Sequence, residues 1–181
     1  LMKKIVSLFF LSFTLFIQAQ EQLSDSKGVI SFEASVPFFE EVKAINEEVI
    51  FSVEIKTGEI SCTVFIKNFK FKRDLMRTHF NENYLESDRY PKATFIGRID
   101  KFDYKFVSQT PTEYQIKGIL KIHGKSKPII SKAWLRKITK GIEIQSTFVV
   151  NTDDFNIEIP TIVAAKISKQ VSIHLKTAFL E

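Results

Sequence analysis

Few side chains in this sequence could take part in chemistry. The candidates are three histidines, one cysteine and a short glycine-lysine-serine run. The sequence has no G-x-S-x-G elbow, no H-E-x-x-H pair and no C-x-x-C pair, so acyl transfer, zinc proteolysis and thiol redox chemistry lack their basic parts. His79, His123 and His174 do not have the spacing of metal ligands. We therefore predict neither a catalytic centre nor a metal site.

The cysteine and the glycine-lysine-serine run both have simpler structural interpretations. Cys62 lies in a strand-like run and is expected to be a small buried apolar side chain rather than a nucleophile. Gly124, Lys125 and Ser126 resemble the end of a phosphate-binding loop, but that loop also requires a glycine at position 119, which is Ile119. A turn between two strands explains the run, so no nucleotide site is predicted.

The elements that would position these side chains are mostly strands. The clearest is 112–123, where alternate residues from Tyr114 to Ile122 form one face that is apolar but for Gly118, and most residues between them are polar. The segments 142–150 and 171–179 show the same alternation. Less regular strand candidates are 28–35, 49–55, 60–71, 93–102 and 129–138. About eight short strands with few helical spacers predict an all-β antiparallel sandwich or closed barrel, and closure would remove exposed edges.

Two interruptions of the strand pattern predict short helices. The first would start at Pro37 and run to position 45, with one apolar stripe beside acidic residues. The second would begin at Asp74 as N-cap and carry Met76, Phe80 and Tyr84 on one face, at positions i, i+4 and i+8. The fold is therefore expected to be all-β with one or two short helices.

The N-terminus has the pattern of an export signal. Lys3 and Lys4 precede an apolar run at 5–17, which at about 13 residues is shorter than the roughly 20 that a spanning helix needs. Ala19 supplies an acceptable small residue before a cleavage point. We expect residues 1–19 to be a cleaved signal peptide, residues 20–181 to form the domain, and the protein to be periplasmic or secreted without a stable membrane anchor.

Length and charge limit the remaining classes. About 160 residues after the leader suit one domain with one substantial core. Loss of the two leader lysines lowers the formal charge from +5 to +3, and the basic residues are spread among apolar ones along the predicted strands. A weak, dispersed charge of this kind is typical of a solvated barrel exterior, so no nucleic-acid partner is predicted.

Two longer motifs resemble a known family. Residues 79–95, HFNENYLESDRYPKATF, resemble the signature H-F-n-s-x-x-y-x-x-x-x-Y-P-x-A-T-F of the YceI-like, polyisoprenoid-binding family. Residues 118–128, GILKIHGKSKP, resemble its strand and turn G-x-L-t-i-h-G-v-t-k-p, with Lys125 and Ser126 where valine and threonine are usual. Residues 154–157 and 166–179 occupy the places of its final strands, so the resemblance covers essentially the whole chain after the leader.

The resemblance implies a lipocalin-like antiparallel β-barrel of about eight strands that encloses a long isoprenoid or similar amphiphile and has no established reaction. We therefore expect an exported binding or carrier protein for an isoprenoid, quinone or fatty-acyl-like lipid, with no cofactor beyond that ligand. A homodimer is a further expectation.

The candidate ligand contacts fall into an apolar wall and a polar set at the mouth. The expected wall residues are Phe32, Phe69, Met76, Phe80, Tyr84, Phe95, Tyr114, Leu120 and Phe148. The expected head-group residues are Arg77, His79, Asn81, Arg89 and His123. The alternative for the aromatic wall residues is that they fill the core, because an eight-stranded barrel can be packed solid or hold a ligand. The alternative for His79 and Asn81 is a structural hydrogen bond between helix and barrel.

Two other functions compete with lipid carriage. The first is a lipid-modifying hydrolase or isomerase that uses His79 or His123 as general base, which requires a carboxylate or nucleophile beside the ring inside a pocket. The second is a stress-related interaction module that binds another exported protein through an exposed apolar patch.

Overall fold

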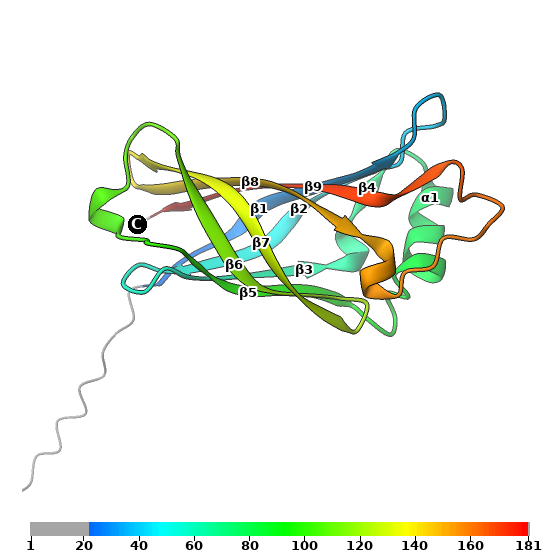
Figure 1. Cartoon of the computed structure of the whole chain (residues 1–181), viewed down its shortest axis with the longest axis horizontal. Coiled ribbons are helices and arrows are strands. Elements are labelled where there is room, and N and C mark those ends of the chain that lie inside the picture. The colour runs from blue at the N-terminus through cyan, green and yellow to red at the C-terminus, as the bar shows by residue number, and fades with distance from the viewer. Residues whose placement is uncertain (1–21, 181) are drawn as a thin grey trace, which may run out of the picture.

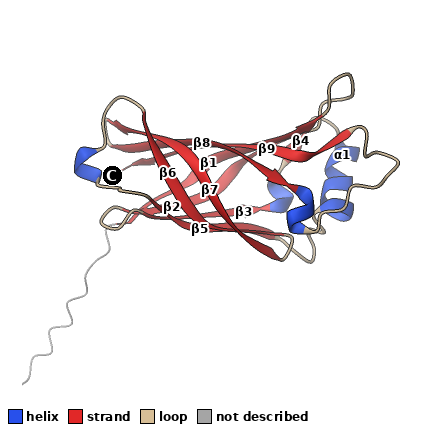
Figure 2. Cartoon of the chain, in the orientation of Figure 1, coloured by secondary structure: helices blue, strands red, loops and turns tan. Residues whose placement is uncertain are grey.

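The computed structural model describes residues 22–180, and strands dominate this part of the chain (Figure 2). The strands are β1 (Gln22–Ser35), β2 (Lys43–Glu54), β3 (Glu59–Phe65), β4 (Lys70–Phe71), β5 (Lys92–Ile99), β6 (Thr112–Ile122), β7 (Lys125–Ile138), β8 (Gly141–Asn151) and β9 (Ile167–Leu180). The helical segments are η1 (Ile66–Asn68), α1 (Asp74–His79), η2 (Phe80–Tyr84), η3 (Tyr104–Phe106) and η4 (Thr152–Phe155).

Eight of the described strands close into an antiparallel barrel. The neighbours follow the order β1-β9-β8-β7-β6-β5-β3-β2, and pairing of β1 with β2 closes the circle. The short β4 adds to β2 at one end of the barrel. Almost every barrel strand pairs with the next one in sequence. Short turns join β2 to β3, β6 to β7 and β7 to β8, whereas longer segments join β3 to β5, β5 to β6 and β8 to β9. The predicted all-β antiparallel barrel of about eight strands is confirmed.

The period-two pattern of the sequence matches burial in the barrel. On β6, Ile116 and Leu120 are buried while Lys117 and Lys121 are exposed. On β8, the inward Ile142, Ile144 and Ser146 are buried, and Glu143 between them is also buried, in ion pairs with Arg136 and Lys176. Each strand therefore places one set of apolar side chains inside the barrel.

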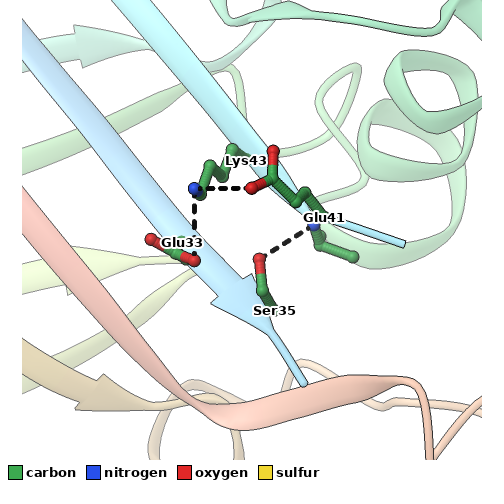
Figure 3. Close-up of polar contacts among 5 residues, drawn as sticks. Glu33, Ser35, Glu41 and Lys43 are labelled. Atoms are coloured by element: carbon green, nitrogen blue, oxygen red, sulfur yellow. Dashed lines mark hydrogen bonds and ion pairs between the residues drawn. The ribbon is translucent and has the colours of Figure 1, made fainter. Parts of the chain in front are cut away.

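The predicted first helix, at 37–45, is wrong. This segment is a β-hairpin that joins β1 to β2, and Phe38 at its tip has a φ of 69°, outside the range of a right-handed helix. At the base of the hairpin, the Val42 backbone N–H donates to Ser35 Oγ at 3.1 Å (Figure 3). Cross-strand pairing overrides the weak helical stripe because it buries Ala44 at an inward position of β2.

The predicted second helix is present as α1 and η2. It starts one residue from the expected cap, because Arg73 is the extended N-cap and Asp74 the first helical residue. Met76, Phe80 and Tyr84 are half-buried. None of the helices in the part of the chain that the structure describes is long and apolar enough to cross a membrane.

A two-residue turn joins β6 to β7. His123 and Gly124 have φ values of 48° and 73°, which is the pattern of a type I′ hairpin turn. Strand β7 begins directly at Lys125 and continues through Pro128. The turn is therefore shorter than the sequence suggests.

Strand β7 is paired on both sides along only part of its length. It pairs with β8 over 133–138, while 125–132 pairs only with β6 among the described strands. Pro128 lies in this singly paired half, where its missing N–H costs no ladder hydrogen bond on the β8 side. We term the stretch along 125–132, where β7 is not paired with β8, the half-seam. An ion pair between Lys127 and Asp154 of η4 spans it at 3.3 Å.

Candidate functional site

An apolar cavity of about 400 Å³ occupies the barrel interior on the side of α1. This volume lies within the roughly 300–1,000 Å³ that is usual for small-molecule sites. Inward-facing residues of all eight barrel strands contribute to its wall, together with α1, η2 and the segment that precedes β9. The barrel therefore encloses space that its own side chains do not fill.

The opposite end of the barrel is packed solid. Val53, Ile99, Leu135, Ile142 and Phe179 are at most 1% exposed, and none of these five lines the cavity. The cavity is therefore blind at this end, where η3 and the C-terminus lie (Figure 1). Its mouth is at the other end, between α1, the β1–β2 hairpin and the 156–166 loop (Figure 1).

Four phenylalanines form one wall of the mouth and hold the helix against it. Phe80 of η2 packs on Phe32 of β1, Phe69 and Phe71 with ring centroids 5.3, 5.5 and 5.0 Å apart. Phe32 also contacts Phe69 and Phe71 edge-on, at 5.3 and 5.9 Å. Offset and edge-to-face contacts of this kind add to the burial of apolar area. This Phe cluster couples the position of α1 and η2 to the shape of the mouth.

Most of the predicted wall residues line the cavity. These are Phe32, Phe69, Met76, Phe80, Tyr84, Phe95, Leu120 and Phe148. Tyr114 does not line it, because it lies near the start of β6, toward the filled end, where it packs against the core. Phe71 also lines the cavity but was not predicted, since it falls in the irregular end of the 60–71 strand candidate. Contact of these residues with a ligand stays a prediction.

Phe95 is placed by two glycines that face each other across β5 and β6. Gly97 pairs directly with Gly118, and a Cβ added to Gly118 would lie 2.5 Å from Phe95 Cζ. The aromatic ring therefore lies across the paired glycines, in space that larger residues would fill. In this way Gly118 of the second motif and Gly97 of β5 shape the cavity wall.

Of the predicted head-group residues, His79 alone lines the cavity, at its mouth. Arg77 faces Asp74, with Nη2 3.0 Å from Oδ1. Asn81 Nδ2 donates to the Arg77 carbonyl at 2.8 Å, which is a bond within the helix rather than to the barrel. Arg89 lies over the Tyr90 ring at 5.0 Å. The structure thus gives Arg77, Asn81 and Arg89 local partners, and their role toward a head group stays a prediction.

Several polar residues of the mouth were not predicted. Glu40, Lys166 and Ser168 line the cavity there, on the hairpin and at the start of β9. Residues 156–166 carry no period-two or helical pattern, so the sequence had no signal that would place Lys166 near the hairpin. Burial raises the pKa of Tyr84, which keeps its hydroxyl neutral as a hydrogen-bond donor.

His123 connects three segments instead of facing the cavity. Its Nε2 lies 2.6 Å from Glu86 Oε2, and its Nδ1 lies 3.2 Å from the Phe155 carbonyl oxygen. Its ring also packs edge-on against Tyr90, with centroids 4.6 Å apart. Both hydrogen-bond partners are acceptors when Glu86 is ionised, so the arrangement is fully satisfied when both ring nitrogens carry hydrogen. The ring thus joins the β6–β7 turn to η4 and to the segment after η2.

We expect His123→Asn to lower the free energy of unfolding by about 1–2 kcal/mol, because it removes a charge-assisted hydrogen bond that is half-buried. Asparagine tolerates the positive φ of this position, so the substitution tests the ring and not the backbone. Urea denaturation measures the effect. The matched control is His174→Asn, on the outer face of β9, where stability should change by less than about 0.5 kcal/mol. Equal effects of the two substitutions would contradict the structural role of His123.

Cys62 provides a probe of the cavity wall. It lines the cavity, is 8% exposed, and burial raises the pKa of its thiol to about 12 from an ordinary 9.0. Because the thiolate is the reactive form, we expect the folded protein to react with a disulfide reagent at pH 8 roughly a thousandfold more slowly than the denatured chain. Absorbance of the released chromophore follows the reaction with and without guanidinium. Similar rates in both states would show that the cavity wall is open to water.

The histidines do not assemble into a metal site. His79 lies at the mouth, His123 at the β6–β7 turn, and His174 shares a hydrogen bond of 3.1 Å with Thr147 Oγ1. Among residues 22–180, no three His, Cys, Asp or Glu side chains gather in a way that could hold a metal ion.

Comparison with known proteins gives a family and a fold. The model of the YceI-like domain matches residues 22–179. A polyisoprenoid binding domain from Saccharophagus degradans, implicated in plant cell wall breakdown, superposes with a TM-score of 0.77 at 15% identity, over 88% of this chain and 97% of that one. Burkholderia cenocepacia BcnA gives 0.69 at 14% identity, over 83% and 94%. The Campylobacter jejuni YCEI protein gives 0.54 at 18% identity, over 74% and 81%. No curated protein matches the sequence significantly.

Proposed function

The chain belongs to the YceI-like domain family, and on that premise we propose that it is a binding or carrier protein that holds a long apolar amphiphile inside its barrel. The cavity carries this proposal. Its wall is almost entirely apolar, it is closed at one end, and its few charged lining residues, such as Glu40 and Lys166, lie at the mouth. A ligand with an apolar tail and a polar end fits this distribution.

The energetics support a tail-first orientation. Each methylene group that moves from water into the apolar cavity contributes about 0.8 kcal/mol, and a polar head left at the mouth avoids the cost of burial without partners. The mouth offers His79 and the neutral Tyr84 hydroxyl as hydrogen-bonding groups. The isoprenoid, quinone or fatty-acyl class is favoured because a polyisoprenoid binding domain shares the fold along nearly its whole length.

Extraction of the purified protein tests the proposal. Solvent extracts of the protein, isolated without detergent from its native cells, should contain one lipid class in near-stoichiometric amount by mass spectrometry. A variant with a filled cavity, Ser131→Phe, purified in parallel, should lack it. Equal lipid content in the two preparations would show that co-purifying lipid does not occupy the cavity and would overturn the proposal.

The geometry gives less support to the enzyme alternative. His123 has a carboxylate beside it, but neither His123 nor Glu86 lines the cavity. His79 lines the cavity, yet it has no ion-pair partner among the described residues. A histidine base inside the pocket would need both features in one place. Binding without catalysis therefore remains the proposal.

We also propose export, with cleavage near Gln20. Support comes from the lysines and the apolar run of the first 17 residues, which lie outside the described residues. The mass of the protein recovered from the periplasm or the medium gives the first residue directly. Recovery in the cytoplasm with the leader intact would overturn this part of the proposal. A homodimer stays a prediction.

A further inference from the structure

Four large apolar side chains project into solvent around the mouth of the cavity. These mouth tips are Phe38, Phe39, Leu75 and Ile162, which are 105, 46, 65 and 86% exposed. They come from three separate segments: the β1–β2 hairpin, α1 and the 156–166 loop. These segments lie at the same end of the barrel (Figure 1). In sequence, three of the tips directly adjoin cavity-lining residues, namely Glu40, Met76 and Val163. The tips therefore stand on the segments that form the rim of the mouth.

The hairpin presents its tip on a braced base. Below the tip, Val42 N–H donates to Ser35 Oγ, and Lys43 Nζ lies 3.1 Å from Glu41 and 3.5 Å from Glu33 (Figure 3). Phe38 itself has a φ of 69°, a conformation that costs energy for a bulky residue. A strained aromatic residue that is fully exposed contributes nothing to the core. It points to a contact outside the molecule.

The charges around the mouth do not oppose a lipid surface. Glu40 pairs with Arg73 at 2.6 Å, and Asp74 pairs with Arg77 at 3.0 Å. At the hairpin base Lys43 is shared by Glu33 and Glu41, which leaves one negative charge there. Lys72 and Lys166 add two positive charges at this end, and Glu158 of the 156–166 loop adds one negative charge. The mouth is therefore close to neutral overall, and apolar contact rather than charge would dominate its binding.

We propose that the mouth tips insert into the surface of a phospholipid bilayer, so that the cavity opens onto the membrane. The inference rests on the proposed function, because an apolar ligand that leaves a bilayer through such a contact does not cross water. Separate projecting tips on three segments suit insertion between lipid head groups. A docked protein would more often need one continuous flat surface of larger area.

Vesicle flotation tests the proposal. The chain from residue 20 onward, which contains the whole described barrel, is mixed with phosphatidylcholine and phosphatidylglycerol vesicles. Removing an inserted apolar side chain weakens partition roughly tenfold or more, so Phe38→Ser with Ile162→Ser should lower it by at least about a hundredfold. The matched control is Phe106→Ser, 80% exposed at the filled end of the barrel, which should leave partition unchanged. Unchanged partition of the double variant would overturn the proposal.

Two further measurements separate docking from ligand binding. Vesicle binding should persist from low to high salt. A steep loss of binding with salt would show that lysine and arginine side chains, and not the mouth tips, drive it, and would overturn the proposal.

A fluorescent fatty acid added from ethanol should bind the double variant and the unmodified chain equally, but pass from vesicles to the variant more slowly. If neither protein binds the fatty acid while vesicle partition still depends on the tips, docking stands and the proposed function fails. Dimers that the double substitution dissociates, with no vesicle binding, would identify the tips as a self-association surface and overturn docking.

Discussion

Replacing Ser131 with phenylalanine is expected to weaken binding of a long-chain ligand roughly a hundredfold. Ser131 is an inward position of β7, 8% exposed, and its small side chain lines the cavity. A phenyl ring at this position would occupy the space of several methylene groups. Loss of about four buried methylene groups at roughly 0.8 kcal/mol each removes about 3 kcal/mol of binding free energy. Titration with a fluorescent fatty acid measures the affinity.

The neighbouring residue supplies a matched control for this substitution. Ile130 lies on the same strand but points outward and is 67% exposed, so Ile130→Phe places the same phenyl ring outside the barrel. Its affinity should equal that of the unmodified protein. Filling a hollow also costs little stability, so Ser131→Phe should remain folded by circular dichroism. An unaltered affinity of the folded Ser131→Phe variant would place the ligand somewhere other than the cavity.

Replacing Phe80 with alanine is expected to lower the free energy of unfolding by about 2–4 kcal/mol. Truncation of a fully buried phenylalanine costs about 3–5 kcal/mol, and Phe80 is half-buried. The loss comes from the stacked contact with Phe32 and the contacts with Phe69 and Phe71. Guanidinium denaturation measures this effect. Because these contacts hold α1 and η2 at the mouth, ligand affinity should fall as well, roughly tenfold.

A control on the same helical segment separates anchoring from helix propensity. Leu75 of α1 is 65% exposed, so Leu75→Ala should change the free energy of unfolding by less than about 0.5 kcal/mol. Phe80→Leu, which keeps most of the buried area, should recover much of the lost stability. If Phe80→Ala were no more destabilising than Leu75→Ala, the Phe cluster would not be what holds the helix on the barrel.

The strands could be predicted from the sequence because their signal is local. Apolar alternation on β6, β8 and β9 fixes both the existence of each strand and the face that it buries. Antiparallel pairing of β6 with β7 and of β7 with β8 then follows from the two-residue turns between them. The second helix was predictable for the same reason, since Met76, Phe80 and Tyr84 recur at a helical spacing on one face of one segment.

The mouth of the cavity depends on non-local contacts and was only partly predictable. The stripe at 37–45 indicated a helix, but pairing of β1 with β2, which the apolar periodicity of this segment does not report, forms a hairpin instead. Lys166 reaches the mouth on a loop without periodicity, and His123 finds Glu86 across 37 positions of sequence. Whether the aromatic residues surround space or fill it depends on the sum of side-chain volumes across eight strands, which periodicity does not report.

The half-seam between β7 and β8 divides the barrel into a stiff part and a compliant part. Near η3 the wall is fully laddered, so its circumference is set by hydrogen bonds. On the α1 side of the same two strands, no backbone ladder joins β7 to β8. At the edge of the half-seam the Ser146 hydroxyl donates to the Lys132 carbonyl at 2.6 Å, and farther along a surface ion pair joins Lys127 to Asp154, of a kind that contributes little. The distance between β7 and β8 on this side can grow without breaking a backbone ladder between them. We therefore expect this part of the wall to widen more easily than the laddered part near η3 around a guest with branches or rings along its tail.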